Sequence, residues 1–255
     1  MGGIFKGDSN LKRILSVVFA ILLVAVGGFI IHSELTKAES EDAFVAEESP
    51  NPNTHHVEYD LSGSNEEKSK LLEHYEEQSS DVIARMYIPG TSMETPIVDS
   101  DYYFRRNLEG AYDSSGVPFT PDASTFNVAN KNCVIYGHRL DSGEDFGVLK
   151  SYLDQEFYNE HPCIYIETDS GTSEWDIISV FTINISTDSF AYTAYSDMAD
   201  NSSRGVFLGE VRQRNLIDTV DYTYQTGDKL ITLSTCHYET DIDNGRLVVV
   251  AAKRQ

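Results

Sequence analysis

The sequence predicts a mainly β protein: a closed or nearly closed β-barrel with a few peripheral helices, preceded by one transmembrane helix. Three observations lead to this prediction. Short runs rich in β-branched and aromatic residues recur between residues 82 and 252, and clusters of Gly, Pro, Asn and Asp separate them. Only two helical stretches interrupt that series. One apolar run, at residues 14–31, is long enough to cross a bilayer.

The composition excludes several classes of protein. The chain has 255 residues, with 19 Lys and Arg against 41 Asp and Glu, and a formal net charge of -22. We expect no nucleic-acid partner, because affinity for phosphate requires basic patches. A hydrophobic content of 40% excludes an intrinsically disordered chain. The acidic segment 241–245 lacks the glycine phase and the closing Glu of a calcium loop, so we predict no calcium site there. The sequence does not indicate metal dependence, and we predict no metal and no cofactor.

The first 64 residues predict a membrane anchor and a stalk. Residues 14–31 carry no charge, and as a helix they just span a hydrocarbon core of about 30 Å. Lys12 and Arg13 precede this run and Glu34 follows it, so residues 1–13 are expected in the cytoplasm. Residues 32–64 are then an extracellular stalk and residues 65–255 an extracellular catalytic domain of a single-pass protein of the cell membrane. The alternative is a cleaved signal peptide, whose apolar region is usually about 7–15 residues long.

The elements of the domain follow in order. Ser64 or Asn65 is expected to cap a first helix with an apolar stripe of Leu71, Leu72 and Tyr75. The strand-like runs lie at residues 82–88, 95–98, 133–136, 163–168, 175–183, 229–235 and 246–252. The helical stretches lie at residues 145–152 and 204–214.

Three cysteines offer thiol chemistry. Cys133 and Cys163 lie within apolar runs and are interpreted as small buried hydrophobic residues, with a disulfide between them as the alternative. Cys236 differs, because it ends a strand-like run and opens a polar loop. A reactive thiol is expected at such a partly exposed position.

A cysteine nucleophile requires a histidine nearby in space. His237 adjoins Cys236, but neighbouring side chains on an extended strand point to opposite faces. His138 follows a strand and precedes a polar loop, so it is either the catalytic base or a structural histidine at a strand end. Arg246 opens the last strand, ten residues after Cys236, where its guanidinium would stabilise an oxyanion and the thiolate. The alternative is a surface arginine on an acidic protein.

These residues resemble the sortases, the membrane-anchored cysteine transpeptidases of Gram-positive bacteria. The resemblance rests on Leu233-Ser-Thr-Cys236, on Arg246, and on Tyr136-Gly-His138-Arg upstream. Class B is indicated by the helix before the segment Ile88-Pro-Gly-Thr91, by the helical stretch after the histidine, and by a further helical stretch near residues 195–215. The resemblance covers roughly residues 65 to 254 and implies an eight-stranded sortase barrel.

The resemblance also implies roles and partners. Cys236 would be the nucleophile, His138 the acid and base, and Arg246 the residue that orients the substrate or stabilises the oxyanion. Tyr136, Ser234, Asn107 and Tyr192 would bind substrate. The enzyme would cleave an NPxT-like sorting signal of a secreted protein after its threonine. It would pass the threonine through a thioester to an amine of a peptidoglycan precursor or a pilin. Class B relatives often carry an acidic residue just after the cysteine, where this chain has His237 and Tyr238.

Several alternatives stay open at the level of sequence. The chain could be a cysteine endopeptidase that hydrolyses its substrate, or a surface-binding module without catalysis. The same residues are compatible with a thiolate–imidazolium pair or with a neutral pair. The sequence does not distinguish wall anchoring from pilus assembly.

Overall fold

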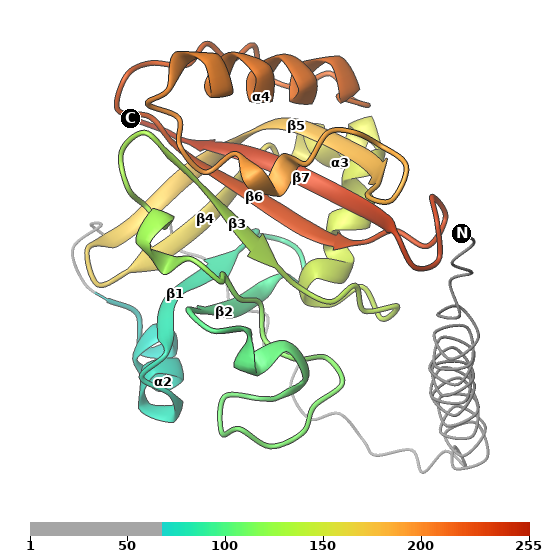
Figure 1. The fold of residues 1–255 in the computed structure, drawn as a ribbon. Coiled ribbons are helices and arrows are strands. Elements are labelled where there is room, and N and C mark those ends of the chain that lie inside the picture. Colours follow the sequence, from blue (N-terminus) through green and yellow to red (C-terminus); the bar gives the residue numbers. More distant parts are fainter. Residues whose placement is uncertain (1–67) are drawn as a thin grey trace, which may run out of the picture. The chain divides into compact units, whose positions relative to one another are not determined.

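The computed structural model describes residues 68–255 of the chain (Figure 1). The predicted cytoplasmic segment 1–13, anchor 14–31 and stalk 32–64 lie outside the described residues. Within residues 68–255, no helix has the length and apolar character needed to span a bilayer.

The described residues form one curled sheet of seven strands. The spatial order is β2-β1-β4-β5-β7-β6-β3. Neighbouring strands are antiparallel, except that β3 runs parallel to β6. The strands are β1 Val82–Tyr87, β2 Glu94–Val98, β3 Lys131–Tyr136, β4 Cys163–Thr168, β5 Gly171–Asn184, β6 Lys229–Cys236 and β7 Gly245–Lys253. All seven predicted strand regions are present.

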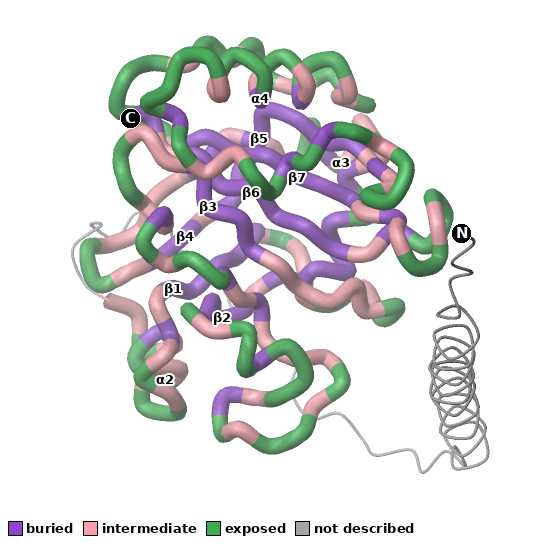
Figure 2. Tube along the Cα trace, in the orientation of Figure 1, coloured by how far each residue is buried: buried purple, intermediate pink, exposed green. Residues whose placement is uncertain are grey.

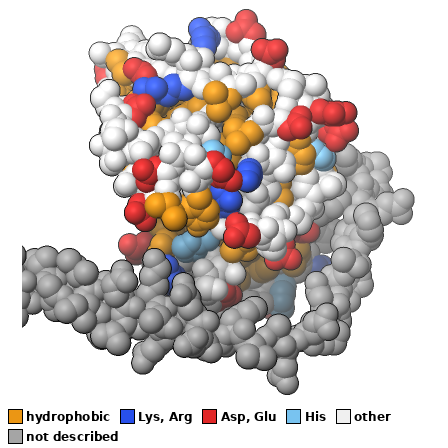
Figure 3. Space-filling model, turned by 90° about the vertical axis from the view of Figure 1, so that its right-hand side faces the viewer, with side chains coloured by type: hydrophobic (Ala, Val, Ile, Leu, Met, Phe, Trp, Pro, Cys, Tyr) orange, Lys and Arg blue, Asp and Glu red, His pale blue; other side chains and the backbone are white. Residues whose placement is uncertain are grey.

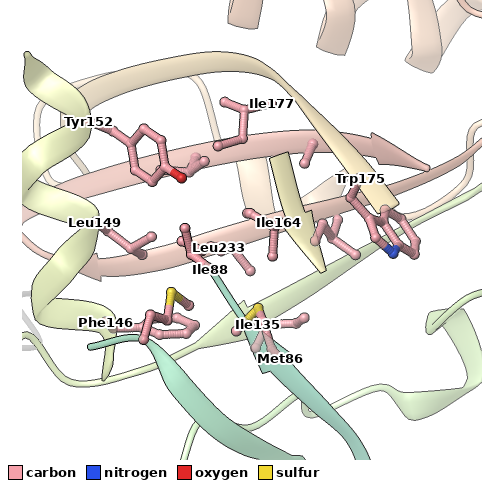
Figure 4. Close-up of a cluster of buried hydrophobic side chains, with 14 of the residues drawn as sticks. Met86, Ile88, Ile135, Phe146, Leu149, Tyr152, Ile164, Trp175, Ile177 and Leu233 are labelled. Atoms are coloured by element: carbon pink, nitrogen blue, oxygen red, sulfur yellow. The ribbon is translucent and has the colours of Figure 1, made fainter. Parts of the chain in front are cut away.

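The central strands are apolar on both faces because each face is covered. Along β6 and β7, side chains alternate between two clusters of buried residues. Leu233 and Val249 belong to the larger cluster inside the curl, which Figure 4 shows around Tyr152 and Trp175. Leu230 and Val248 belong to the second cluster, beneath helix α4, which lies across the outer face in Figure 1. Figure 2 shows the buried strands between more exposed helices and loops.

The resemblance implied eight strands, and the described residues form seven. The two edge strands, β2 and β3, are nevertheless joined through Phe119, which bridges Val98 on one side and Tyr136 on the other. Phe119 exchanges backbone hydrogen bonds with Tyr136 at 2.9 and 2.8 Å, while Val98 bonds to Pro118 and Thr120 at 3.0 Å. Because only one residue pairs with each edge, and Pro118 has no N–H to extend the ladder, this segment forms a bridge instead of an eighth strand.

The first helix begins later than predicted. Helix α2 spans Lys70–Gln78, and its N-cap is Ser69, not Ser64 or Asn65. The Ser69 hydroxyl accepts from the Leu72 N–H at 3.2 Å, and both the N–H and the hydroxyl of Ser69 donate to the buried Glu167 carboxylate. A partner distant in sequence therefore selects the cap, which local patterning did not show. The predicted apolar stripe is confirmed in part, since Leu72 is fully buried.

The helical stretch after His138 is a 3₁₀ helix, η3 Asp145–Leu153, and a short helix that we did not predict, α3 Gln155–Glu160, follows it. Helix α4 spans Asn201–Arg214 and begins three residues before the predicted 204, because Asp200 caps it. Three short 3₁₀ turns complete the structure: η1 Asp101–Arg105, η2 Ala123–Thr125 and η4 Tyr192–Ala194.

Candidate active site

Cys236 and Arg246 face each other across the hairpin of β6 and β7. They are direct register partners in this antiparallel pair. The Cβ atoms of such partners are about 4.5–5.5 Å apart, and their side chains emerge on the same face of the sheet. The ten-residue spacing in the sequence thus becomes a direct cross-strand pair, and the Arg246 guanidinium donates to the carbonyls of Gly245 and Asp243 at 2.8 and 3.1 Å.

His138 comes to the same place through the parallel pairing of β3 with β6. Tyr136 is the register partner of Ser234, two residues before Cys236. Beyond this pair, the Gly137 N–H donates to the Ser234 carbonyl at 3.2 Å, and the Thr235 hydroxyl donates to the Gly137 carbonyl at 2.8 Å. These bonds hold the segment that carries His138 beside the end of the Cys236 strand.

Gly137 is required at this position. A Cβ built on it would lie 2.4 Å from the ring of Phe146, the second residue of η3. The chain before His138 can therefore pack on the core only without a side chain.

A cavity of about 450 Å³ opens at these strand ends. Six of the seven predicted site residues line it: Tyr136, His138, Tyr192, Ser234, Cys236 and Arg246. Asn107 is not among the lining residues, and its side chain instead accepts from the Ala111 N–H at 2.9 Å, closing a turn. A larger cavity, of about 640 Å³, lies between α4 and residues 215–224 and contains none of the predicted site residues.

The walls of the smaller cavity are mostly aromatic and apolar, and no sequence motif marks the residues that form them. Phe104, Val117, Phe119, Ile185, Phe190 and Ala191 contribute these surfaces. They come from the loop after β2 and the loop after β5. Such residues carry no local signal, because an aromatic side chain in a loop has the same pattern whether it lines a site or fills the core.

Tyr192 supplies one of the polar groups that line this cavity. Its hydroxyl lies 2.7 Å from the Ser234 hydroxyl, and burial raises the pKa of the Tyr192 phenol. The loop that carries it is fixed by Asp188, whose carboxylate accepts from the Phe190 N–H at 2.8 Å and from Arg214 of α4 at 2.9 Å.

His138 is oriented by a backbone group. Its Nε2 lies 2.7 Å from the carbonyl oxygen of Phe104 in η1, and the two rings pack with centroids 4.4 Å apart. A search for side-chain partners in the sequence could not have found this contact.

Charged side chains tie the loop after His138 to the loop after Cys236. Arg139 donates to Glu239 at 2.6 Å, Lys150 of η3 pairs with the same carboxylate, and the Arg139 guanidinium lies 4.7 Å from the ring centre of Tyr238. The bonds from Lys150 and then Arg139 lower the pKa of Glu239 to about 2.

Figure 3 shows one face of the molecule, on which acidic side chains are scattered between apolar patches, as expected for a strongly acidic chain.

The three thiols differ in their surroundings. All three cysteines are free, and Cys133 and Cys163 are buried, in agreement with their interpretation as small hydrophobic residues. Burial, followed by the bond to Asp176, raises the pKa of Cys163 to about 12. Cys236 is partly exposed and lines the cavity. His237 turns away, as the strand geometry predicted: it is buried and its Nδ1 lies 2.7 Å from the Thr240 hydroxyl.

A partly exposed thiol, an imidazole and a guanidinium that line one cavity are the groups that a cysteine enzyme uses for covalent catalysis. Comparisons with known proteins show which family of cysteine enzymes this chain belongs to. Residues 86–254 match the sortase domain family. The chain is 30% identical over 176 residues to sortase B of Listeria monocytogenes, covering 67% of this chain and 69% of the relative.

Solved structures give the same result. Sortase B of Bacillus anthracis in complex with AAEK1 has a TM-score of 0.62 and 29% identity, covering 75% of this chain and 89% of that one. A Staphylococcus aureus sortase B–substrate complex has a TM-score of 0.62 and 24% identity, covering 72% and 84%. The chain belongs to the sortase family, and its similarities are to class B. It is a sortase B-type cysteine transpeptidase, an enzyme that cleaves sorting signals.

Proposed function

We propose that this enzyme cleaves an NPxT-like sorting signal after its threonine and transfers the threonine to an amine of a cell-wall precursor. The observation that carries the proposal is the register pairing of Cys236 with Arg246 at a cavity that His138 also lines. The aromatic walls, with the hydroxyls of Tyr192 and Ser234, suit a short extended peptide whose few polar groups need partners.

In the first half of the proposed reaction, the Cys236 thiolate bonds to the threonine carbonyl carbon. The carbonyl electron pair moves to oxygen, where the Arg246 guanidinium donates to it. The intermediate collapses by breaking the C–N bond, and the leaving amine takes a proton from the His138 imidazolium. The product is a thioester between Cys236 and threonine.

In the second half, the acceptor amine attacks the thioester carbonyl and gives a proton to His138. The C–S bond breaks and returns the Cys236 thiolate, so the protons balance over the two halves. A positioned amine competes with water because binding makes its attack effectively intramolecular. A pilin lysine as acceptor would turn the same chemistry into pilus assembly, and water as acceptor would make the enzyme an endopeptidase.

The test uses the full chain in detergent with quenched NPxT peptides, a small amine and product analysis by mass spectrometry. We expect an amine adduct that disappears in Cys236→Ala and persists in Cys163→Ser, which alters a buried thiol. Cleavage without an adduct would favour hydrolysis or a different acceptor. Absence of Cys236-dependent turnover on both NPxT and LPxT peptides would refute the proposal and favour a binding module.

We also propose that residues 14–31 anchor the enzyme in the membrane, with residues 1–13 inside and the catalytic domain outside. The uncharged run with basic residues before it supports this orientation. Cell fractionation should find the full chain with the membranes and a variant lacking residues 1–31 in the soluble fraction. A reporter enzyme that is active only outside the cytoplasm, fused after residue 255, should be active. A soluble full-length chain would contradict the anchor.

A further inference from the structure

The hydrogen bond between His138 and the Phe104 carbonyl shows which nitrogen of the imidazole ring carries a proton. A carbonyl oxygen has no hydrogen to donate, so at 2.7 Å the His138 Nε2 must carry the proton and donate it. This holds for the neutral ring and for the imidazolium. The ring nitrogen left to gain and lose a proton is therefore Nδ1.

Phe104 restrains the same ring a second time. Its side chain packs against the imidazole with centroids 4.4 Å apart and the planes 42° apart. One residue thus fixes both the ring plane and the tautomer, a task that a carboxylate performs in the Ser-His-Asp triad. The carbonyl differs from a carboxylate in carrying no net charge, so it orients the ring without adding a negative charge beside it.

The position of the Phe104 carbonyl depends in turn on a glycine. Residues 113–117 return alongside η1, where the Val117 N–H donates to the Tyr103 carbonyl and the Asp113 N–H to the Arg105 carbonyl, each at 3.1 Å. Gly116 lies between them with a φ of +59°. A Cβ on Gly116 would lie 2.3 Å from the Phe104 carbonyl oxygen, the atom to which His138 donates. Any side chain there must displace that oxygen or the loop itself.

We propose that the Phe104 carbonyl, held in place by the absence of a side chain at Gly116, is the positioning group of the catalytic histidine. It keeps the His138 proton on Nε2 and makes Nδ1 the nitrogen that exchanges protons with Cys236 and the leaving amine. Gly116 and Phe104 are positioning residues that act through His138. The inference rests on the acid–base role of His138 in the proposed function.

The first experiment reads the tautomer directly and requires no turnover. The full chain in detergent, with ¹⁵N-labelled histidine, is titrated by NMR, and His138→Gln identifies the His138 signals. We expect the neutral His138 ring to be protonated at Nε2. Phe104→Ala retains the backbone carbonyl and should keep this tautomer, whereas Gly116→Ala should shift the ring toward a mixture. A neutral ring protonated at Nδ1 in the parent protein would overturn the proposal.

The second experiment separates positioning from stability. Gly116→Ala is compared with Gly143→Ala, because Gly143 also has a positive φ, +80°, but a Cβ there would meet no atom within 4 Å. Both variants incur the backbone strain of alanine at positive φ, and only Gly116→Ala displaces the carbonyl.

On the sorting-signal peptide, we expect Gly116→Ala to lower kcat by about 10- to 1,000-fold, with KM within about twofold and an altered pH profile of kcat. The upper bound is below the loss of about 10⁴ that follows from a wrong histidine tautomer in serine proteases. Gly143→Ala should stay within about threefold of the parent. A Gly116→Ala protein that is folded and keeps the parent tautomer and kcat would refute the proposal.

If Gly116→Ala does not fold, Phe104→Pro perturbs the same loop instead. The tautomer of His138 in the parent protein, measured by NMR, then still tests whether the proton lies on Nε2. If the parent transfers no peptide, the proposed function fails, while the tautomer and its response to Gly116→Ala remain measurable.

Discussion

Asp145→Asn should stabilise the protein at neutral pH and have little effect in acid. Asp145 is the first residue of η3 and has a left-handed backbone, with a φ of +44°. Burial of its carboxyl and then the nearby Glu144 raise the pKa of Asp145 from 3.8 to about 6. The folded protein therefore opposes ionisation of this group more than the unfolded chain does.

The sign and size of the change in the free energy of unfolding follow from proton linkage. Because the folded pKa is above the unfolded one, the stabilising contribution is complete below about pH 4 and is lost as the pH rises through about 6. A shift of about two pKa units corresponds to at most about 3 kcal/mol. Because the group is partly screened by solvent, we expect Asp145→Asn to raise the free energy of unfolding by about 1–3 kcal/mol at pH 7.5. Asparagine also tolerates the left-handed conformation.

The assay is urea unfolding of the full chain in detergent at a series of pH values from 4 to 8. The difference between variant and parent should grow from near zero at pH 4 to its full size above pH 6.5. Asp221→Asn, at an exposed carboxyl, controls for removing one negative charge from an acidic protein. An equal gain at every pH, or a loss of stability at pH 7.5, would refute the reasoning.

Three further predictions concern packing and charge. Glu167→Ala removes the carboxylate that lies 2.7 Å from the buried Arg85, which keeps its pair with Glu94, and also removes the acceptor for the Ser69 N-cap of α2. Urea unfolding should therefore show a loss of about 2–4 kcal/mol. A loss below 1 kcal/mol would contradict this. Glu239→Gln weakens the ion pair with Arg139 that links the loop after His138 to the loop after Cys236, and steady-state kinetics should show a several-fold fall in kcat/KM while the urea midpoint changes little. Unchanged kcat/KM would exclude a role for the link. Leu149→Ala creates a cavity at a fully buried site in the main core and should lower the free energy of unfolding by about 2–5 kcal/mol, whereas a near-neutral result would show that the site collapses.

The sequence by itself determined those features whose signals are local. Alternating and apolar runs located all seven strands, because strand burial imposes a pattern on neighbouring residues. The pairing of Cys236 with Arg246 could also be predicted from the sequence, because both residues flank a single hairpin formed by consecutive strands. The burial of Cys133 and Cys163 followed from their apolar surroundings in the chain.

Only the tertiary structure decided the features that join distant segments. The parallel pairing of β3 with β6 brings His138 to Cys236 across almost a hundred intervening residues, and no local pattern encodes that choice. Ser69 caps α2 because the distant Glu167 binds it. Phe119 joins the sheet edges through backbone bonds, and Phe104 orients His138 through its carbonyl. Every residue has a backbone carbonyl, so contacts made through that group leave no trace in the sequence.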